Sequence, residues 1–270
     1  MFRIGKRLTA VLLAVLLFAV CISVLAGCDA DEQTPEDTDH LPVLRIGSDE
    51  YPPYFYIGED GNFAGIDVEL ATEACRRMGF RAEFVRISWS EKDEALQNGE
   101  VDCLWGSFSM TGREDRYDWA GPYMQSRQMV AVRADSEIFT LADLANKRIA
   151  VQATTKPDEL FSAGNDSRIP QIKQLYCMFD MENVFAALRK GYVDAIAGHE
   201  TALLEKMKSV SGTYRILDEP LMNVELGVAF KKGGDKQPAE HLTQTLGQMR
   251  RDGFTAEVLE KFGLGPERAR

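Results

Sequence analysis

The sequence predicts an α/β fold built from two similar lobes. From residue 43 onward, short apolar runs typical of strands alternate with segments of helical periodicity. Residues 95–102 (ALQNGEVD) resemble residues 187–194 (ALRKGYVD), and each segment is typical of a helix end, a glycine C-cap and a strand. This folded part has about 225 residues, enough for two modest domains or one large one.

The strongest helix signal lies between Ile66 and Met78, where apolar residues recur at helical spacing and Gly79 follows as a stop. The other expected helices are Glu91–Gln97, one beginning at Thr140, one opening at Thr154–Asp158, Met181–Lys190 capped by Asp180, Glu200–Lys208, Pro238–Arg251 and Thr255–Phe262. The expected strands are Leu44–Gly47, Phe84–Ile87, Val101–Trp105, Arg148–Val151, Val193–Gly198 and Glu225–Phe230.

The N-terminus has the pattern of an export signal. Basic residues precede an apolar run, Leu8–Val24, and small residues precede Cys28. Residues 1–27 resemble a bacterial lipoprotein signal peptide, which implies that Cys28 becomes lipidated and that the protein is anchored to the outer face of the cell membrane. An uncleaved membrane anchor is the alternative, since Leu8–Ala26 is just long enough to span a bilayer. Residues 28–42 are acidic and lack apolar periodicity, so we expect a disordered tether.

The charge of the chain argues against nucleic-acid binding. The full sequence has 31 basic and 42 acidic residues. Without the three basic residues of the signal, 28 basic and 42 acidic residues remain, a formal charge of −14. Nucleic-acid binding requires a basic face.

No cofactor or metal is expected from the cysteines and histidines. Cys75, Cys103 and Cys177 lack metal-type spacing, and we expect small, mostly buried hydrophobic side chains, with one disulfide left open. The three histidines, His40, His199 and His241, are scattered.

The stretch 47–123 contains no nucleophile paired with a base, and its residues suit holding a small polar solute. Its fixed points are Tyr51–Tyr54, Gly65–Val68, Trp89, Ser107–Thr111, Arg113 and Gly121–Tyr123. With these motifs, nearly all of residues 43–265 resembles the extracytoplasmic solute-binding proteins of family 3, the polar amino acid receptors that feed ABC importers.

The resemblance implies a two-lobed, type II periplasmic-binding-protein fold in which each lobe is a mixed sheet flanked by helices. Lobe 1 would comprise residues 43–125 plus 228–265, and lobe 2 residues 126–227. Two crossover strands, near Tyr123–Val130 and Glu225–Phe230, would form the hinge. It also implies a monomer that delivers its ligand to an ABC transporter permease.

Arg113 is the main candidate for ligand binding in lobe 1, because a planar guanidinium matches a carboxylate bidentately. The resemblance implies that it holds the α-carboxylate, although the segment from Thr111 to Glu114 is one residue shorter than the family pattern. Arg116 is the rival, and surface pairing of Arg113 with a neighbouring acid is the alternative. The further candidates are Ser107 and Ser109 after a strand end, the rings of Tyr51 and Trp89, and Asp49 in the first turn.

In lobe 2 the candidates are Thr154 and Thr155 at a helix N-terminus, with Lys156 in reach of an acidic ligand group. His199 stands where the resemblance implies an aspartate that binds the α-ammonium. A neutral imidazole supplies no negative charge, so either Glu200 or another acid takes over or the ligand lacks a standard α-amine.

Three functions are compatible with these residues. The first is the binding component of an importer for a small amino acid or amino-acid-like carboxylate. The second is an exported dehydratase for a cyclic acid on the same fold, with Glu200 or His199 as the general acid. The third is a sensor that docks on a membrane receptor.

Overall fold

The computed structural model describes residues 40–270, and the segment Leu41–Arg270 forms one compact unit. The expected signal peptide, Cys28 and most of the tether lie outside the described residues. Within the described part, no helix is both long and apolar enough to cross a membrane.

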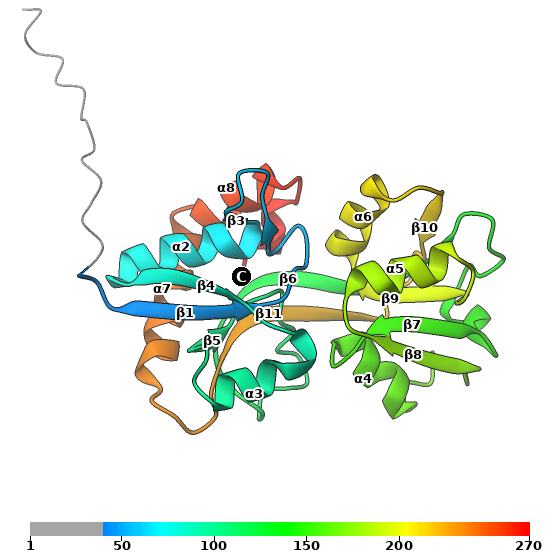
Figure 1. Ribbon diagram of the computed structural model, residues 1–270, viewed down its shortest axis with the longest axis horizontal. Coiled ribbons are helices and arrows are strands. Elements are labelled where there is room, and N and C mark those ends of the chain that lie inside the picture. Colours follow the sequence, from blue (N-terminus) through cyan, green and yellow to red (C-terminus); the bar gives the residue numbers. More distant parts are fainter. Residues whose placement is uncertain (1–39) are drawn as a thin grey trace, which may run out of the picture. The chain divides into compact units, whose positions relative to one another are not determined.

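The unit contains a continuous sheet that passes through two lobes (Figure 1). Its strand order is β4-β1-β5-β11-β6-β9-β7-β8, with β10 paired to β6. The bounds are β1 Val43–Ser48, β4 Arg81–Arg86, β5 Cys103–Leu104, β6 Asp118–Arg133, β7 Arg148–Gln152, β8 Gln174–Met178, β9 Ala195–His199, β10 Tyr214–Ile216 and β11 Met222–Phe230. In lobe 1, β1 is parallel to β4 and β5; in lobe 2, β7 is parallel to β8 and β9. The predicted fold class is confirmed.

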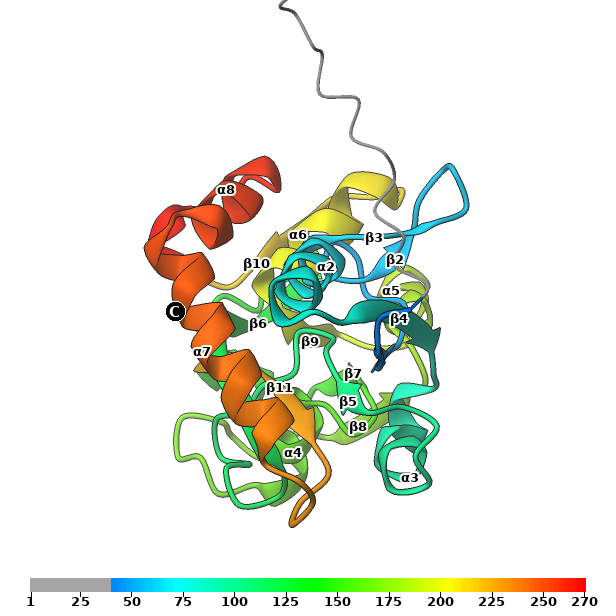
Figure 2. The same cartoon turned by 90° about the vertical axis from the view of Figure 1, so that its left-hand side faces the viewer.

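Helices cover the faces of both lobes. Their bounds are α2 Ile66–Met78, α3 Lys92–Gln97, α4 Lys156–Ala163, α5 Met181–Arg189, α6 Glu200–Ser209, α7 Gln237–Arg251 and α8 Phe254–Lys261. Figure 2 shows α7 and α8 beside α2, and all three pack on one another in lobe 1. The C-terminal segment thus returns to the lobe in which the described chain begins.

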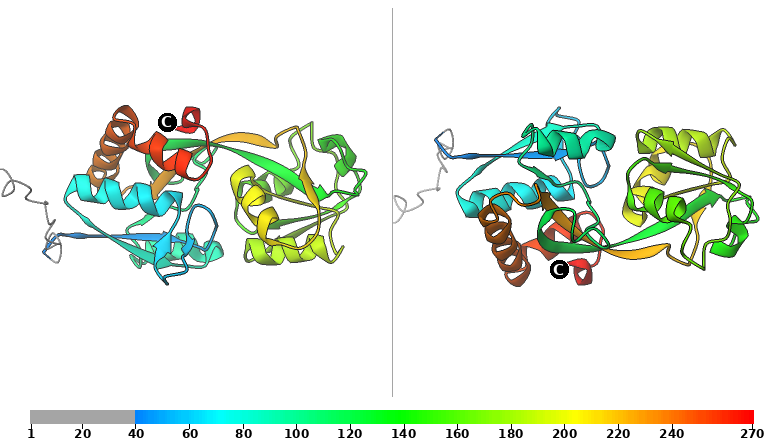
Figure 3. Two further views of the ribbon diagram at one scale, coloured as in Figure 1. Left: turned by 90° about the horizontal axis from the view of Figure 1, so that it is seen from above. Right: turned by 90° about the horizontal axis from the view of Figure 1, so that it is seen from below.

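The lobes are joined by β6 and β11, which pair in antiparallel fashion and run between them side by side (Figure 3). β6 pairs with β11 at its lobe 1 end and with β9 and β10 at its lobe 2 end. These two strands are the crossover connections expected near Tyr123–Val130 and Glu225–Phe230, and both extend beyond the expected ranges.

The repeated sequence segments form the same contact in each lobe. Asp102 accepts hydrogen bonds from the backbone nitrogen and the guanidinium of Arg45, at 2.8 and 2.6 Å. Asp194 accepts the equivalent bonds from Arg148, at 2.8 and 2.7 Å. Asp102 thus ties β1 of lobe 1 to the loop that follows α3, and Asp194 ties β7 of lobe 2 to the loop that follows α5. This shared contact accounts for the similarity of the two sequence segments.

Most expected elements agree with the structure to within a few residues, and α2 has the expected bounds. The expectation for Val101–Trp105 was too long, because only Cys103 and Leu104 pair as a strand. Three features had not been expected: β8, β10 and a small hairpin formed by β2 (Tyr56–Ile57) and β3 (Phe63–Ala64).

The cysteine expectation holds for two of the three thiols. Cys75 and Cys103 are free and buried in the core. Cys177 is free but exposed, and its thiol lies 3.2 Å from Oδ1 of Asp158. The three cysteines are thus mostly buried, as expected, and Cys177 is the exception because it lies on β8, the outermost strand of the sheet.

Candidate functional site

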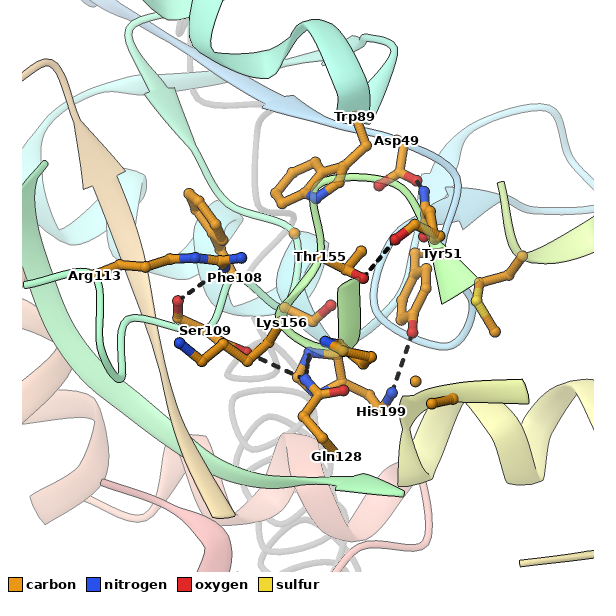
Figure 4. Close-up of a pocket in the computed structure, with 17 residues that line it drawn as sticks. Asp49, Tyr51, Trp89, Phe108, Ser109, Arg113, Gln128, Thr155, Lys156 and His199 are labelled. Carbon is orange, nitrogen blue, oxygen red and sulfur yellow. Dashed lines mark hydrogen bonds between the residues drawn. The ribbon is translucent and has the colours of Figure 1, made fainter. Parts of the chain in front are cut away.

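A cavity of about 30 Å³ lies between the two lobes, where the ends of strands from both lobes meet. Eight of the nine ligand-binding residues predicted from the sequence line it: Asp49, Tyr51, Trp89, Ser107, Ser109, Arg113, Thr155 and His199. Figure 4 shows most of these side chains gathered around the cavity. This volume holds about two water molecules, so a larger ligand enters only when the lobes or the lining side chains move.

Arg113 is buried, with 3% of its surface exposed. Its Nε lies 2.9 Å from Oε1 of Glu159, and its Nη1 and Nη2 donate to the backbone oxygens of Ser109 and Thr154 at 3.3 and 3.2 Å. The guanidinium also lies 5.1 Å from the ring centroid of Phe108 (Figure 4). The alternative of a surface arginine paired with Glu114 or Asp115 therefore does not hold.

The rival, Arg116, has a different position. Its side chain is 59% exposed, and it contacts Glu159 from the solvent side at 2.7 Å. Arg116 does not line the cavity. Of the two arginines, Arg113 is the one that lines the cavity.

The loop that carries Ser107 and Ser109 is fixed by a buried carboxylate. Asp67, at the start of α2, accepts hydrogen bonds from the Ser107 backbone nitrogen at 2.6 Å and from the Tyr123 hydroxyl at 2.8 Å. Burial raises the pKa of Asp67 from 3.8 to about 7, although both hydrogen bonds act in the opposite direction. Ser107 has a φ of 46°, so this loop takes an uncommon backbone conformation directly at the cavity.

Lobe 2 contributes the segment between β7 and α4. Thr155 is the N-cap of α4, and its hydroxyl donates to the Gln152 carbonyl at 2.6 Å. Thr154 is the one predicted residue outside the lining. Its hydroxyl lies 2.8 Å from Nζ of Lys92, a buried lysine of lobe 1. Thr154 therefore joins the two lobes instead of facing the cavity.

Asp49 and Gln152 form a second polar contact between the lobes. Nε2 of Gln152 lies 2.5 Å from Oδ2 of Asp49. Burial raises the pKa of Asp49 from 3.8 to about 6, although the hydrogen bond from Gln152 and the charge of Lys92 favour the ionised form. Asp49 is therefore mostly ionised at neutral pH.

His199, at the end of β9, is a neutral member of the site. Its Nδ1 lies 2.9 Å from the Ser126 hydroxyl and its Nε2 lies 2.9 Å from Nε2 of Gln128. A neutral ring satisfies both contacts when Nδ1 donates to Ser126 and Nε2 accepts from Gln128. Burial lowers the pKa of His199 from 6.5 to about 3. Its backbone nitrogen donates to the Tyr51 hydroxyl of lobe 1 at 3.3 Å (Figure 4).

Glu200 is not placed to replace a missing acid. Its carboxylate forms ion pairs with Arg127 and Arg268, the latter at 2.8 Å, and it does not line the cavity. These arginines hold the pKa of Glu200 below its usual value against the opposing effect of burial.

Several lining residues had not been predicted, above all Phe108, Gln128 and Gln152. Gln128 and Gln152 are buried amides within mostly apolar strands, β6 and β7. A buried polar side chain needs a hydrogen-bond partner, so an amide in an apolar run was the signal available in the sequence. Among the described residues, no cluster of three or more His, Cys, Asp or Glu side chains suits a metal ion.

The chain is similar to solute-binding proteins in its family model, in curated relatives and in solved structures. The family of bacterial extracellular solute-binding proteins, family 3, matches residues 44–265. The L-cystine-binding protein TcyJ of Escherichia coli (strain K12) is 25% identical over 258 residues, which cover 92% of this chain and 94% of that protein. The crystal structure of Tv2483 bound to L-arginine has a TM-score of 0.75 at 29% identity, covering 82% of this chain and 90% of that chain. The ancestral amino acid-binding protein AncCDT-1, a precursor of cyclohexadienyl dehydratase, has a TM-score of 0.71 at 25% identity and covers 82% and 95%.

Proposed function

Because the chain belongs to family 3 of the bacterial extracellular solute-binding proteins, we propose that it is the extracytoplasmic binding component of an ABC importer. Its ligand is a small amino acid or an amino-acid-like carboxylate, held between two lobes that close around it. The relatives named above bind L-cystine and L-arginine.

One observation carries this proposal: the buried guanidinium of Arg113 at the wall of the cavity between the lobes. A buried guanidinium needs charged or polar partners, and it binds a carboxylate through two parallel hydrogen bonds. In this structure the Nε of Arg113 donates to the carboxylate of Glu159. When the lobes open, Glu159 moves away with α4, and the carboxylate of a ligand can then bind the Arg113 guanidinium in its place.

The proposal is tested by isothermal titration calorimetry of the purified protein, residues 41–270, against amino acids, amines and small carboxylates. Binding without turnover of any member, together with a decrease in the radius of gyration by small-angle scattering, is the expected result. Lack of heat from every member would contradict the proposal.

A dehydratase is the second candidate, favoured only by the similarity to the precursor of cyclohexadienyl dehydratase. It needs a general acid near the ligand. Glu200 is held ionised by two arginines outside the cavity, and His199 is neutral with a lowered pKa. Neither residue is suited to donate a proton at neutral pH. Incubation with prephenate or arogenate, followed by detection of an aromatic product, tests this candidate directly.

The proposal extends to processing and domain limits. Residues 1–27 form a lipoprotein signal peptide, Cys28 carries the lipid, and the mature protein is a monomer with lobe limits at residues 43–125 plus 228–265 and 126–227. Metabolic labelling with a radioactive fatty acid tests the anchor. The wild type is expected to be labelled and Cys28→Ser is not; equal labelling of both would refute the assignment.

A further inference from the structure

The charged side chains at the cavity are mainly cationic. Arg113, Lys156 and Asp49 line it directly. Two further charged side chains interact with lining side chains: Glu159 pairs with Arg113 and Lys156, and Lys92 has its Nζ 5.2 Å from the Trp89 ring centroid. The cavity is thus surrounded by three cations and two carboxylates, a surplus of one positive charge.

Other acids near the site are engaged away from the cavity. Asp158 accepts hydrogen bonds from the Thr154 backbone and the Ser162 hydroxyl. Asp180 caps the first turn of α5 through the backbone nitrogen of Asn183. Asp93, next to Lys92, is exposed and accepts from the Tyr117 hydroxyl. None of the three lines the cavity. Two more acids lie outside the lining. Glu114 is exposed and accepts from the Gly112 backbone nitrogen, and Asp67, whose pKa is raised by burial to about 7, accepts from the Ser107 backbone nitrogen and the Tyr123 hydroxyl.

The surplus is carried by buried side chains. The exposed fractions are 3% for Lys92, 3% for Arg113 and 8% for Lys156. Buried charges are stable only when they are paired and hydrogen-bonded. A zwitterion with an uncharged side chain leaves this surplus of positive charge uncompensated. The acid that lines the cavity and could face its ammonium is Asp49, which already accepts a hydrogen bond from Gln152. A ligand with a net charge of −1 makes the closed site neutral.

Lys156 is placed to bind such a charge. Among the described residues its Nζ donates to the side chain of Glu159 at 3.2 Å, although an ammonium offers three donors. The ammonium lies over Gly112 of lobe 1, where a Cβ would come within 2.8 Å of Nζ. Because Gly112 has no side chain, the ammonium of Lys156 in lobe 2 can pack against the lobe 1 loop that carries Arg113. Figure 4 shows Lys156 and Arg113 at the same end of the cavity, opposite Asp49.

We propose that the ligand is a net anion, and that Lys156 binds an acidic group in addition to the carboxylate held by Arg113. The inference rests on the proposed function and names the charge class of its ligand. Acidic amino acids and dicarboxylates without an amine share this chemistry. In an acidic amino acid, the ammonium faces Asp49.

The test compares isosteric ligands that differ in charge. Calorimetry measures the affinities of glutamate against glutamine and aspartate against asparagine, with 2-oxoglutarate and arginine as further probes. We expect glutamate or aspartate to bind on the order of tenfold or more tightly than its amide, since a hydrogen bond to a charged group contributes about one more factor of ten. Tight binding of 2-oxoglutarate alone also supports the proposal and identifies a ligand without an amine.

The variant Lys156→Gln assigns the preference to this side chain. It is expected to reduce the glutamate-to-glutamine affinity ratio about tenfold, while Lys173→Gln, which alters an exposed lysine of the same lobe, leaves it unchanged. A ratio unaffected by Lys156→Gln overturns the role of Lys156. If glutamine or arginine binds the wild type as tightly as the acids, the charge class is wrong although the proposed function stands. If no probe and no other amino acid or carboxylate binds, both fail.

Discussion

The replacement Arg113→Ala is expected to abolish binding of any carboxylate ligand. In the structure all three guanidinium nitrogens have acceptors, at 2.9, 3.2 and 3.3 Å, which shows that the fork is oriented within the cleft and not free in solvent. A bidentate contact supplies two charge-assisted hydrogen bonds of about 1.5–3 kcal/mol each. The expected loss is therefore about 3–6 kcal/mol, or roughly 100- to 20,000-fold in Kd.

Calorimetry with the tightest ligand of the wild type measures this loss, after circular dichroism has shown that the variant is folded. Arg116→Ala is the matched control, because Arg116 contacts the same Glu159 but has a 59% exposed side chain; its effect is expected to stay below about 1 kcal/mol. Arg113→Lys keeps the charge without the fork and should give an intermediate Kd. A Kd for Arg113→Ala within threefold of the wild type would refute the assignment.

Three further predictions concern the site and its support. Glu159→Gln removes the carboxylate that pairs with Arg113 and Lys156 and should tighten anion binding about tenfold in calorimetry; weaker binding would contradict this competition. Asp67, with a pKa raised from 3.8 to about 7, binds more protons in the folded than in the unfolded state between these values, so the free energy of unfolding should fall as pH rises through this window. In Asp67→Asn, urea denaturation should show a shallower fall, and an unchanged profile would exclude Asp67 as its source. Gly65→Ala places a Cβ 2.3 Å from the Tyr54 carbonyl oxygen at a φ of +127° and should lower the free energy of unfolding by roughly 2–5 kcal/mol. The control Gly61→Ala, at a φ of +80° with open space around it, should lower it by only about 1 kcal/mol. Equal losses in the two variants would show that the contact with Tyr54 is unimportant.

Local signals in the sequence were sufficient for most of the fold. The helix Ile66–Met78 follows from apolar spacing and a glycine stop, because both act within a few residues. The echo of two segments predicted two similar lobes, and the matched pairs Arg45–Asp102 and Arg148–Asp194 explain it. By contrast β8 and β10 had not been expected. β8 pairs with β7 alone and β10 with β6 alone, so each depends on a neighbour that is remote in sequence and carries a weak local pattern.

The residues of the site, like the elements of the fold, were predicted in part from local sequence and in part only from tertiary contacts. The sequence by itself determined which residue types follow the strand ends, and so it predicted Arg113, the serines and the aromatic rings as a candidate set. Only the tertiary structure decided what each of them meets. It paired Arg113 with Glu159, turned Thr154 toward Lys92, engaged Glu200 with two arginines and surrounded the cavity with buried cations. The physical reason is that pairing, burial and pKa depend on distances between groups that are far apart along the chain, and folding alone sets those distances.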